Sequence, residues 1–500
     1  MHNKILVANR GEIAIRVMRT CREMGIRTVG VFSSADRTAP HILMADEAYQ
    51  IGPPPAAESY LKIDRILEVA QESGATMIHP GYGFLSENIQ FAQAIIEKGL
   101  TWIGPPVKAI REMGDKTVAR QTAIDAGVPV VPGLERPLTI NDDPVAISRE
   151  IGYPVLVKAA GGGGGKGMRI VTKETDLVDF IERARSEAIS SFADDRIFIE
   201  KYLENPHHIE IQILADRHGN CIALGERECS IQRRYQKIIE ESPSPFIDEN
   251  LRRIIMGKAV DLAQAVGYAG VGTVEFLVDS QYNYYFLEMN TRLQVEHPVT
   301  EMITGIDLVR QQIKIAQGDV LEYSQSEINF HGHAIECRIY AEDGFNNFTP
   351  SVGTIHELVL PDGFGVRLDH GLRVGEEVTP YYDPLLGKLI VHGSTRAGAI
   401  SGMHRALSEF HIVGLETIIP LCLTIMENTR FRNGNYDTHF LIDELKNIRS
   451  QKSTNVAEKR NVFAVAAALH HTMTNRKPKI TTGNHALSNW KMTGRQVELQ

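Results

Sequence analysis

Hydrophobic residues in the first hundred positions alternate between short apolar runs and a stretch with helical spacing. Apolar runs at residues 4–8, 28–32, 77–78 and 101–103 predict strands, and residues 12–24 repeat apolar positions at the spacing of an amphipathic helix. Strands that alternate with helices are typical of a doubly wound α/β sheet. We therefore expect the chain to begin with such a sheet.

Residues 79–88 directly follow one of these predicted strands, and Tyr82 lies between Gly81 and Gly83 in this segment. Open parallel sheets bind their ligands at the carboxyl ends of strands. Tyr82 is therefore a candidate binding residue, although a tight turn with a packed aromatic ring explains the same pattern equally well.

A glycine-rich segment separates two apolar runs between residues 153 and 171. Residues 161–165 are all glycine and precede Lys166 and Gly167, which predicts a hairpin whose loop offers backbone N–H groups to phosphate. A plain linker is the alternative, but such linkers usually carry serine and lack apolar runs on both sides. The chain lacks the Gly-Lys-Ser or Gly-Lys-Thr of a P-loop, and the turn after the first strand has too few glycines for a dinucleotide-binding fingerprint.

Polar and mostly apolar side chains alternate in residues 288–296, which read Glu-Met-Asn-Thr-Arg-Leu-Gln-Val-Glu. In an extended strand the even positions would share one face, with Leu287, Met289, Leu293 and Val295 buried behind them. That face would carry carboxylates, amides and a guanidinium, which suit a hard cation such as Mg²⁺, a planar oxyanion and a general base. A half-exposed strand with a solvated face is the alternative.

The remaining patterns predict helices at residues 108–126 and 175–191 and strands at 197–202 and 208–214, the last of them half-buried. Positive charge is concentrated in residues 226–237, for which a solvated face is the ordinary explanation. The positive residues of this run are Arg227, Arg233, Arg234 and Lys237.

Composition narrows the class of protein. With 500 residues, of which 43% are hydrophobic, the chain is long enough for two to four subdomains. A net charge of -9 and a pI near 6.1 argue against a nucleic-acid-binding protein. The five cysteines form no Cys-x-x-Cys pair, and neither a secretion signal nor a membrane-spanning apolar run occurs, so we expect a cytoplasmic protein without a membrane partner.

Together these motifs resemble the ATP-grasp fold, in which two α+β lobes hold ATP between them. The matching residues are Lys116, Lys158, the glycine hairpin, Glu200-Lys201-Tyr-Leu203, Glu275 and Glu288-Met-Asn290. Residues 79–88, 232–237, 290–298 and 336–338 narrow the resemblance to biotin carboxylase, and the motifs follow the family's order across about residues 1–447.

The resemblance implies an α/β and α+β multidomain fold and an ATP-grasp ligase. Its expected parts are a Rossmann-like, doubly wound N-terminal domain at 1–114, an ATP-grasp domain at 115–330 with a mobile lid at about 131–203, a C-terminal α+β biotin carboxylase domain at 331–447, and a linker with a partial C-terminal extension at 448–500. Such an enzyme carboxylates biotin with ATP and bicarbonate, through carboxyphosphate.

The resemblance also implies the roles of individual residues. ATP would be bound by Lys116, Lys158, Gly164, Gly165, Glu200, Lys201, Leu203, His208, Glu275 and Glu288, and Mg²⁺ or Mn²⁺ by Glu275, Glu288 and Asn290. Bicarbonate and biotin would be bound by Lys237, Arg292, Gln294, Val295, Arg338 and Tyr82. The catalytic residues would be Glu296 as the base, with Arg292, Lys237 and Arg338.

Two features depart from the family's usual pattern. Tyr235 replaces a histidine that many members place near the nucleotide, which makes a direct ATP contact from this side chain doubtful. No Ala-Met-Lys-Met tetrapeptide occurs, so biotin would be attached to a separate biotin carboxyl carrier protein. The other implied partners are a carboxyltransferase subunit and a second copy of the chain. The positions that match the family's dimer interface are Arg19, Glu23, Phe364 and Arg367.

The C-terminal residues resemble the segment that follows the carboxylase domain in acyl-CoA carboxylase α chains. Residues 450–459 are polar, residues 461–473 have an apolar face of helical period, and residues 488–494 look like the start of a β-rich module. In those chains a small barrel tethers the transferase subunit, but here the module stops early. We expect the carrier chain to complete it or the tail to dock on a partner, with a frayed tail as the alternative.

Three enzymatic functions stay open at this point. The first is the biotin carboxylase subunit of an acyl-CoA carboxylase, which acts on acetyl- or propionyl-CoA and serves fatty acid metabolism. The second is the same subunit of a two-subunit pyruvate or 2-oxoacid carboxylase, and the third is another ATP-grasp ligase. A silent nucleotide-binding scaffold is disfavoured because Lys237, Glu288, Arg292, Glu296 and Arg338 are all present.

Overall fold

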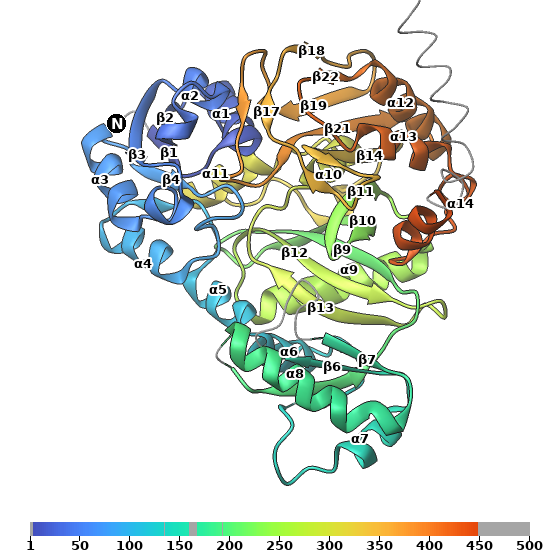
Figure 1. Cartoon of the computed structure of the whole chain (residues 1–500). Coiled ribbons are helices and arrows are strands. Elements are labelled where there is room, and N and C mark those ends of the chain that lie inside the picture. The colour runs from blue at the N-terminus through green and yellow to red at the C-terminus, as the bar shows by residue number, and fades with distance from the viewer. Residues whose placement is uncertain (1–3, 135, 160–167, 193, 449–500) are drawn as a thin grey trace, which may run out of the picture. The chain divides into compact units, whose positions relative to one another are not determined.

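A computed structural model describes residues 4–134, 136–159, 168–192 and 194–448 (Figure 1). Residues 1–443 form one compact unit, and of the second unit only residues 444–448 are described. The loop of the glycine hairpin, which includes Gly164 and Gly165, lies outside the described residues. The expectations about the tail at 450–500 lie outside them as well.

The chain begins with a five-stranded parallel sheet in the order β3-β2-β1-β4-β5. Its elements are β1 (Lys4–Val7), α1 (Gly11–Glu23), β2 (Arg27–Ser33), α2 (Pro40–Met44), β3 (Glu47–Gly52), α3 (Ile63–Ser73), β4 (Met77–His79), α4 (Ile89–Glu97) and β5 (Thr101–Trp102). The predicted doubly wound sheet is confirmed. Strand order reverses beside β1, so the carboxyl ends of β1 and β4 face a shared crevice, where such sheets bind ligands.

An eight-stranded antiparallel sheet forms the centre of the unit, in the order β13-β12-β9-β10-β11-β14-β21-β19. Its strands are β9 (His207–Ala215), β10 (Cys221–Arg233), β11 (Gln236–Ser242), β12 (Gly270–Val278), β13 (Tyr284–Asn290), β14 (His333–Tyr340), β19 (Val366–His370) and β21 (Leu385–Gly393). Strand β11 pairs with β14, so strands from the middle and from the last third of the chain share one sheet.

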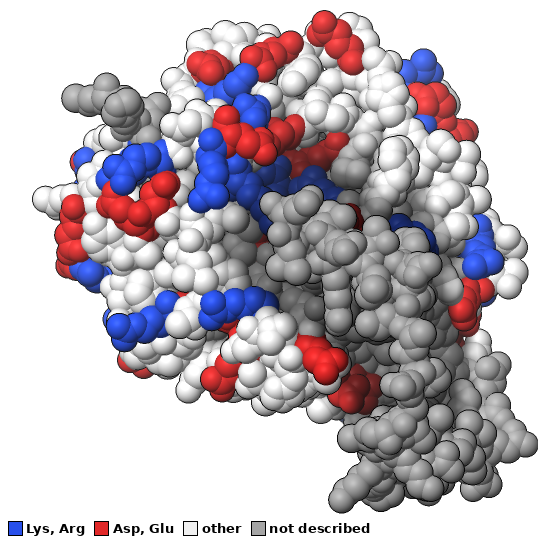
Figure 2. Space-filling view, turned by 90° about the horizontal axis from the view of Figure 1, so that it is seen from above, with Lys and Arg blue, Asp and Glu red and all other residues white. Residues whose placement is uncertain are grey.

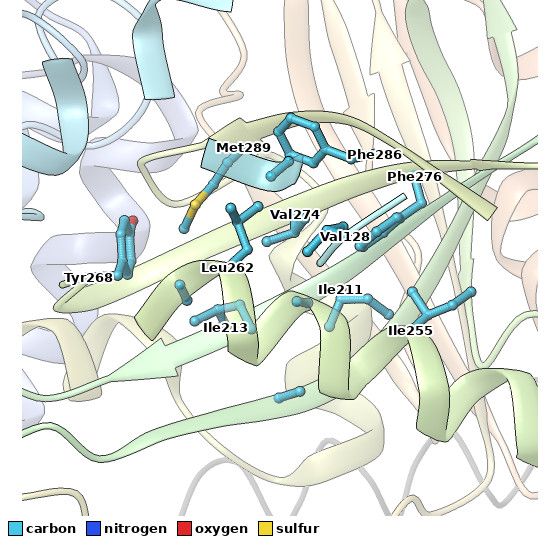
Figure 3. Packing of buried hydrophobic residues seen from close by; sticks show 14 of the residues in the cluster. Val128, Ile211, Ile213, Ile255, Leu262, Tyr268, Val274, Phe276, Phe286 and Met289 are labelled. Carbon is cyan, nitrogen blue, oxygen red and sulfur yellow. The ribbon is translucent and has the colours of Figure 1, made fainter. Parts of the chain in front are cut away.

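Helix α9 (Glu249–Ala265) covers one face of this sheet (Figure 3). Ile211 and Ile213 of β9 and Val274 of β12 pack there against Ile255 and Leu262 of the helix. Side chains alternate along a strand, so the even residues of β9 point to the opposite face. That face is also covered, and every residue of β9 is buried, so the expectation of a half-buried strand was wrong.

A separate three-stranded sheet carries the predicted glycine hairpin. It has the order β7-β6-β8, from β7 (Met168–Val171), β6 (Val155–Ala159) and β8 (Ile197–Lys201), and β6 and β7 are antiparallel as predicted. Helices α7 (Pro144–Ile151) and α8 (Leu177–Phe192) belong to the same part of the chain. Val155, Val171 and Ile181 lie in the core that joins α8 to this sheet.

The prediction of a single helix at residues 108–126 was wrong. The segment forms α5 (Val107–Gly114) and α6 (Lys116–Asp125), which meet at Asp115. The Asp115 carboxylate accepts hydrogen bonds from the N–H groups of Thr117 and Val118, at 2.9 and 3.1 Å, and so begins a new helix. Apolar periodicity continues across this break, which is why the pattern alone does not reveal it.

The other described elements surround these sheets. They are α10 (His297–Thr304), α11 (Leu308–Gln317), β15 (Glu342–Asp343), β16 (Thr349–Pro350), β17 (Gly353–Thr354), β18 (Glu357–Val359), β20 (Glu377–Val378), α12 (Arg396–Glu409), β22 (His411–Val413), α13 (Ile419–Glu427) and α14 (Thr429–Arg432). No helix among the described residues is both long and apolar enough to cross a membrane. Seen from above, acidic and basic side chains lie beside one another rather than in a field of one sign (Figure 2).

Candidate active site

The polar segment 288–296 forms a strand only in its first part. Strand β13 ends at Asn290, and α10 begins at His297 with Pro298 in its first turn, so the expected extended segment up to Glu296 was wrong. The burial pattern differs too, because Leu287 is 41% exposed whereas Glu296 is only 2% exposed. The chain turns inward after Asn290 and brings the last polar side chains into the interior.

Lys237 lies at the centre of the buried charges. Its Nζ donates to Glu210 Oε2 at 2.7 Å, Glu275 Oε1 at 3.0 Å and Glu296 Oε1 at 2.6 Å. Burial alone would lower the pKa of Lys237, but these three carboxylates raise it well above its ordinary value. Lys237 is therefore a permanent cation. Because Lys237 and Arg227 are both buried, the solvated face given for residues 226–237 was wrong for these two residues, whereas Arg234 is exposed.

Glu296 is held by a second cation. Its Oε2 accepts a hydrogen bond from Arg338 Nη2 at 2.9 Å, while Arg338 Nε donates to Glu240 Oε1 at 2.6 Å. Burial and the nearby Glu210 favour the neutral acid, but Lys237 and Arg338 outweigh them and lower the pKa of Glu296. At neutral pH Glu296 is thus an ionised carboxylate, which is the state that a general base requires.

Arg292 is oriented by the loop that follows β4. Its Nε donates to Glu87 Oε2 at 2.8 Å, and its Nη2 donates to Asn290 Oδ1 at 2.8 Å. Thr291 also donates to Glu87, from its N–H at 3.0 Å and its hydroxyl at 3.1 Å. The two segments that stood out in the sequence, 79–88 and 288–296, therefore meet at Glu87.

Tyr82 lies in a tight turn between two glycines, each with a φ of +66°. Its hydroxyl donates to Glu12, and its ring is half-buried, so the turn with a packed aromatic ring is present. Lys388 of β21 lies 5.9 Å from the ring centroid and donates to the Val295 carbonyl at 2.9 Å. Lys388 thus connects the crevice of the parallel sheet to the backbone beside Glu296.

Two carboxylates and an amide lie together on β12 and β13. Glu275 is opposite Glu288 in the register, and Asn290 donates from Nδ2 to Glu275 Oε1 at 2.9 Å. Within the described residues, the side chain of Glu288 makes no hydrogen bond or ion pair. Carboxylate and amide oxygens are the ligands that Mg²⁺ prefers. The donor set therefore fits the divalent cation that the sequence suggested.

The residues expected to bind ATP lie on both sheets. Lys158, Glu200 and Lys201 belong to the three-stranded sheet, whereas His208, Glu275 and Glu288 belong to the eight-stranded sheet. Lys158 Nζ contacts Glu200 Oε2 at 2.7 Å, and Lys201 Nζ donates to the carbonyls of Gly152 and Tyr153 at 2.9 and 3.1 Å. His208 Nε2 is 2.9 Å from Glu275 Oε2. Lys116 begins α6, and Leu203, which is half-buried, follows β8.

Tyr235 occupies the turn between β10 and β11, where Arg234 and Tyr235 have φ values of +49° and +69°. Its hydroxyl lies 4.0 Å from the sulfur of Met168, the first residue of β7. The side chain therefore contacts the base of the glycine hairpin in this structure.

Sequence reasoning missed four charged residues of the site. They are Glu87, Glu210, Glu240 and Lys388. Glu210 had a detectable signal, because it is an even position of the strand that contains His208. Lys388 had no such signal in the sequence, because a single lysine in an apolar strand gives no indication of its partners.

Family models match three consecutive parts of the chain. The biotin carboxylase N-terminal domain matches residues 1–110, the carbamoyl-phosphate synthase L chain ATP-binding domain matches residues 115–324, and the biotin carboxylase C-terminal domain matches residues 336–443. Together these matches span most of the chain in the order of one enzyme family.

Individual relatives agree with these models. Biotin carboxylase 1 of Bacillus subtilis is 51% identical over 88% of this chain and 98% of its own length. The propionyl-CoA carboxylase alpha chain of Ruegeria pomeroyi is 48% identical over 96% of this chain and 74% of its own length. A solved structure of the Hydrogenobacter thermophilus 2-oxoglutarate carboxylase biotin carboxylase domain dimer, in complex with MgADP, ADP and bicarbonate, has a TM-score of 0.84 and 50% identity, and covers 89% of this chain and 98% of that one.

A hairpin lobe beside a buried cluster of lysine and carboxylates defines the ATP-grasp class of ligases. Within that class, the three domain matches and the identities near 50% settle the family. The chain belongs to the biotin carboxylase family, whose members are ATP-grasp ligases.

Proposed function

We propose that this chain carboxylates biotin on a separate carrier chain, with bicarbonate and ATP as substrates and carboxyphosphate as the intermediate. The observation that supports this most directly is the position of Glu296 between Lys237 and Arg338. An ionised base is held between two permanent cations, one on the side of Glu275 and the other on the side of β14. This arrangement suits a reaction that begins with bicarbonate and later develops negative charge on the ureido oxygen of biotin.

These contacts support the residue roles that the resemblance implies. Lys237 and Arg292, with Gln294 and the Val295 backbone, would bind bicarbonate, and Glu296 would remove its proton. The resulting oxyanion attacks the γ-phosphorus of ATP, ADP leaves, and carboxyphosphate forms. Carboxyphosphate then splits into CO₂ and phosphate. The phosphate takes the proton from N1 of biotin, and N1 attacks CO₂.

Arg338 would stabilise the negative charge that develops on the ureido oxygen of biotin, and Tyr82 would position the ring. A preorganised cation at such an oxygen typically lowers a barrier by about 3 to 4 kcal/mol. Glu275, Glu288 and Asn290 would hold Mg²⁺, whose chemistry is to neutralise phosphate charge during transfer. Lys116, Lys158, Glu200, Lys201, Leu203 and His208 would hold the nucleotide.

We propose that the chain is the biotin carboxylase subunit of an acyl-CoA carboxylase. The supporting observation is that the similarity to a propionyl-CoA carboxylase alpha chain extends over 96% of this chain, beyond the 88% covered by biotin carboxylase 1. A 2-oxoacid carboxylase is the second candidate, because the domain of the 2-oxoglutarate carboxylase is 50% identical. Either context requires a biotin carboxyl carrier protein and a carboxyltransferase.

We also propose a homodimer in the cytoplasm. The similar 2-oxoglutarate carboxylase domain is a dimer, and Phe364, one of the positions expected at such an interface, has a fully exposed side chain here. Arg19, at another expected position, is 43% exposed. None of the five cysteines forms a disulfide, as is usual in a reducing compartment.

ADP release from MgATP is expected to require bicarbonate and to rise when free biotin is added. Biotin consumes CO₂ at the site and so draws the reaction forward. The assay compares four mixtures, with and without each of the two substrates. ADP release that ignores both substrates would instead assign the chain to another ATP-grasp ligase.

Removal of residues 450–500 is expected to reduce the amount of carrier chain that co-purifies with the enzyme. These residues lie outside the described structure, and the prediction rests on their resemblance to the tethering segment of acyl-CoA carboxylase α chains. Pull-down of the full chain and the truncated chain with a tagged carrier measures the difference. Equal recovery of the carrier would refute docking by the tail.

A further inference from the structure

Two buried glutamates lie directly opposite one another beside the proposed biotin site. Glu240 on β11 is paired with Glu336 on β14 in the antiparallel register, and both residues are 0% exposed. Opposite residues of an antiparallel pair point to the same face, with Cβ atoms roughly 4.5–5.5 Å apart. The two carboxyl groups are therefore neighbours in the interior.

The hydrogen bonds of this pair are incomplete. Glu240 Oε1 accepts from Arg338 Nε at 2.6 Å, but Glu240 Oε2 and both oxygens of Glu336 lack a partner within the described ranges. Ala334 and Ile390, which share this face of the sheet, pack against Val299 and Ile303 of α10. A carboxylate without partners under such an apolar cover is costly, and two of them side by side cannot both be ionised.

The surrounding groups do not compensate two negative charges. The charged and titratable groups on the elements around the pair are Arg338, Tyr340 and Cys337 on β14, Lys388 on β21, Glu296 and His297 at the start of α10, Lys237 on β11 and Cys229 on β10. Lys237 and Arg338 are already shared with Glu296, and burial lowers the pKa of His297 so far that it stays neutral.

We propose that Glu240 and Glu336 hold one proton between them, and that the single remaining charge positions Arg338 for the biotin half of the reaction. Arg338 is bonded to Glu240 through Nε and to Glu296 through Nη2. When Glu296 takes the proton of bicarbonate, its hold on Arg338 weakens, and Glu240 becomes the remaining charged anchor. The inference rests on the proposed role of Arg338 toward biotin.

The charge of the pair decides how Arg338 behaves. With no proton, two carboxylates would compete with the ureido oxygen for the guanidinium. With two protons, Arg338 would lose its anchor. Burial raises the pKa of Glu240 to about 7 and the pKa of Glu336 well above its ordinary value, which agrees with a pair that keeps one proton near neutral pH and titrates as a unit.

Glu336→Gln separates this proposal from a purely structural role. The glutamine amide can donate to the unpartnered oxygen of Glu240, as a protonated Glu336 would, but it cannot lose that proton. In the wild type, kcat/KM for biotin is expected to fall as the pH rises from 7 to 9. In Glu336→Gln, the decrease in kcat/KM for biotin that is caused by deprotonation of the Glu240–Glu336 pair should be absent.

Glu240→Gln removes the charge that anchors Arg338. It is expected to reduce kcat/KM for biotin by roughly 10- to 100-fold more than it reduces bicarbonate-dependent ATP cleavage without biotin. Glu342→Gln is the matched control, because Glu342 is also buried with an unpartnered oxygen but contacts neither Arg338 nor Glu336. Its pH profile for biotin should follow the wild type.

Thermal unfolding supplies a second readout. A carboxyl group whose pKa is raised by folding stabilises the native state below its unfolded pKa, and this stability is lost as the pH rises through the folded pKa. The Tm of the wild type should therefore decrease between pH 6 and pH 9, and Glu336→Gln should decrease less.

The proposal fails if Glu336→Gln keeps both the alkaline fall and the wild-type slope of Tm, or if Glu240→Gln reduces both reactions equally. A wild-type enzyme without bicarbonate-dependent ATP cleavage would instead overturn the proposed function itself. If Glu240→Gln does not fold, the two measurements on Glu336→Gln still decide the question.

Discussion

Glu296→Gln is expected to reduce bicarbonate-dependent ADP release by roughly 100- to 10,000-fold, which is the usual contribution of a general base. Glutamine keeps the shape and can still accept from Lys237 and Arg338, but it cannot take the proton of bicarbonate. The residues proposed to hold the nucleotide are unchanged, so calorimetry should give an ATP affinity close to that of the wild type.

The control for this variant is Glu427→Gln, whose side chain is 64% exposed on α13 and pairs with His404 at 2.9 Å. Its ADP release should match the wild type. A normal rate in Glu296→Gln would remove this residue from the reaction, and a lost ATP affinity would show that the substitution had disturbed the site as a whole.

Arg227→Ala is expected to lower the free energy of unfolding by about 3 to 5 kcal/mol, the usual cost of removing one partner from a buried ion pair. The fully buried guanidinium makes five hydrogen bonds, at 2.6 to 3.0 Å. Their acceptors are Glu210, Gln212, Thr300, Thr273 and Gln294. Urea denaturation measures the change.

Arg183→Ala provides the comparison for an exposed arginine. Its side chain is 65% exposed on α8 and pairs with Asp179 at 3.0 Å, one helical turn away. Such a pair contributes about 0.5 kcal/mol or less, so this variant should be almost as stable as the wild type. Losses of similar size in the two variants would contradict the structural role assigned to Arg227.

The parts of the fold that depend on local pattern could be predicted from the sequence. Strand and helix alternate in the first hundred residues as their apolar periods indicate, and the apolar runs on either side of the glycine-rich segment pair as antiparallel strands. The two main errors arise where a local signal competes with the pattern. Asp115 caps a new helix within a continuous apolar period, and Pro298 begins α10 shortly after the polar alternation ends.

Part of the candidate site could also be predicted from the sequence, but from residue types rather than from apolar periods. Residues 288, 290, 292, 294 and 296 stand out because their types and spacing suit a cation and an oxyanion, whereas residue 275 was indicated only by the resemblance to the family. The partners of these residues do not stand out in the sequence. Strands β11 and β14 are almost a hundred residues apart, and only their pairing in the sheet brings Glu240 to Arg338. Burial of Lys388 likewise depends on the whole fold and leaves no local signal.

The continuous eight-stranded sheet also fixes the position of Glu275 relative to Arg338. Three strands, β9, β10 and β11, separate β12, which carries Glu275, from β14, which carries Arg338. The side chains nevertheless converge, because Lys237 contacts Glu275 at 3.0 Å and Glu296 at 2.6 Å, and Glu296 accepts from Arg338 at 2.9 Å. The hairpin lobe belongs to a different sheet. A movement of that lobe would therefore leave the short chain of contacts from Glu275 to Arg338 unchanged.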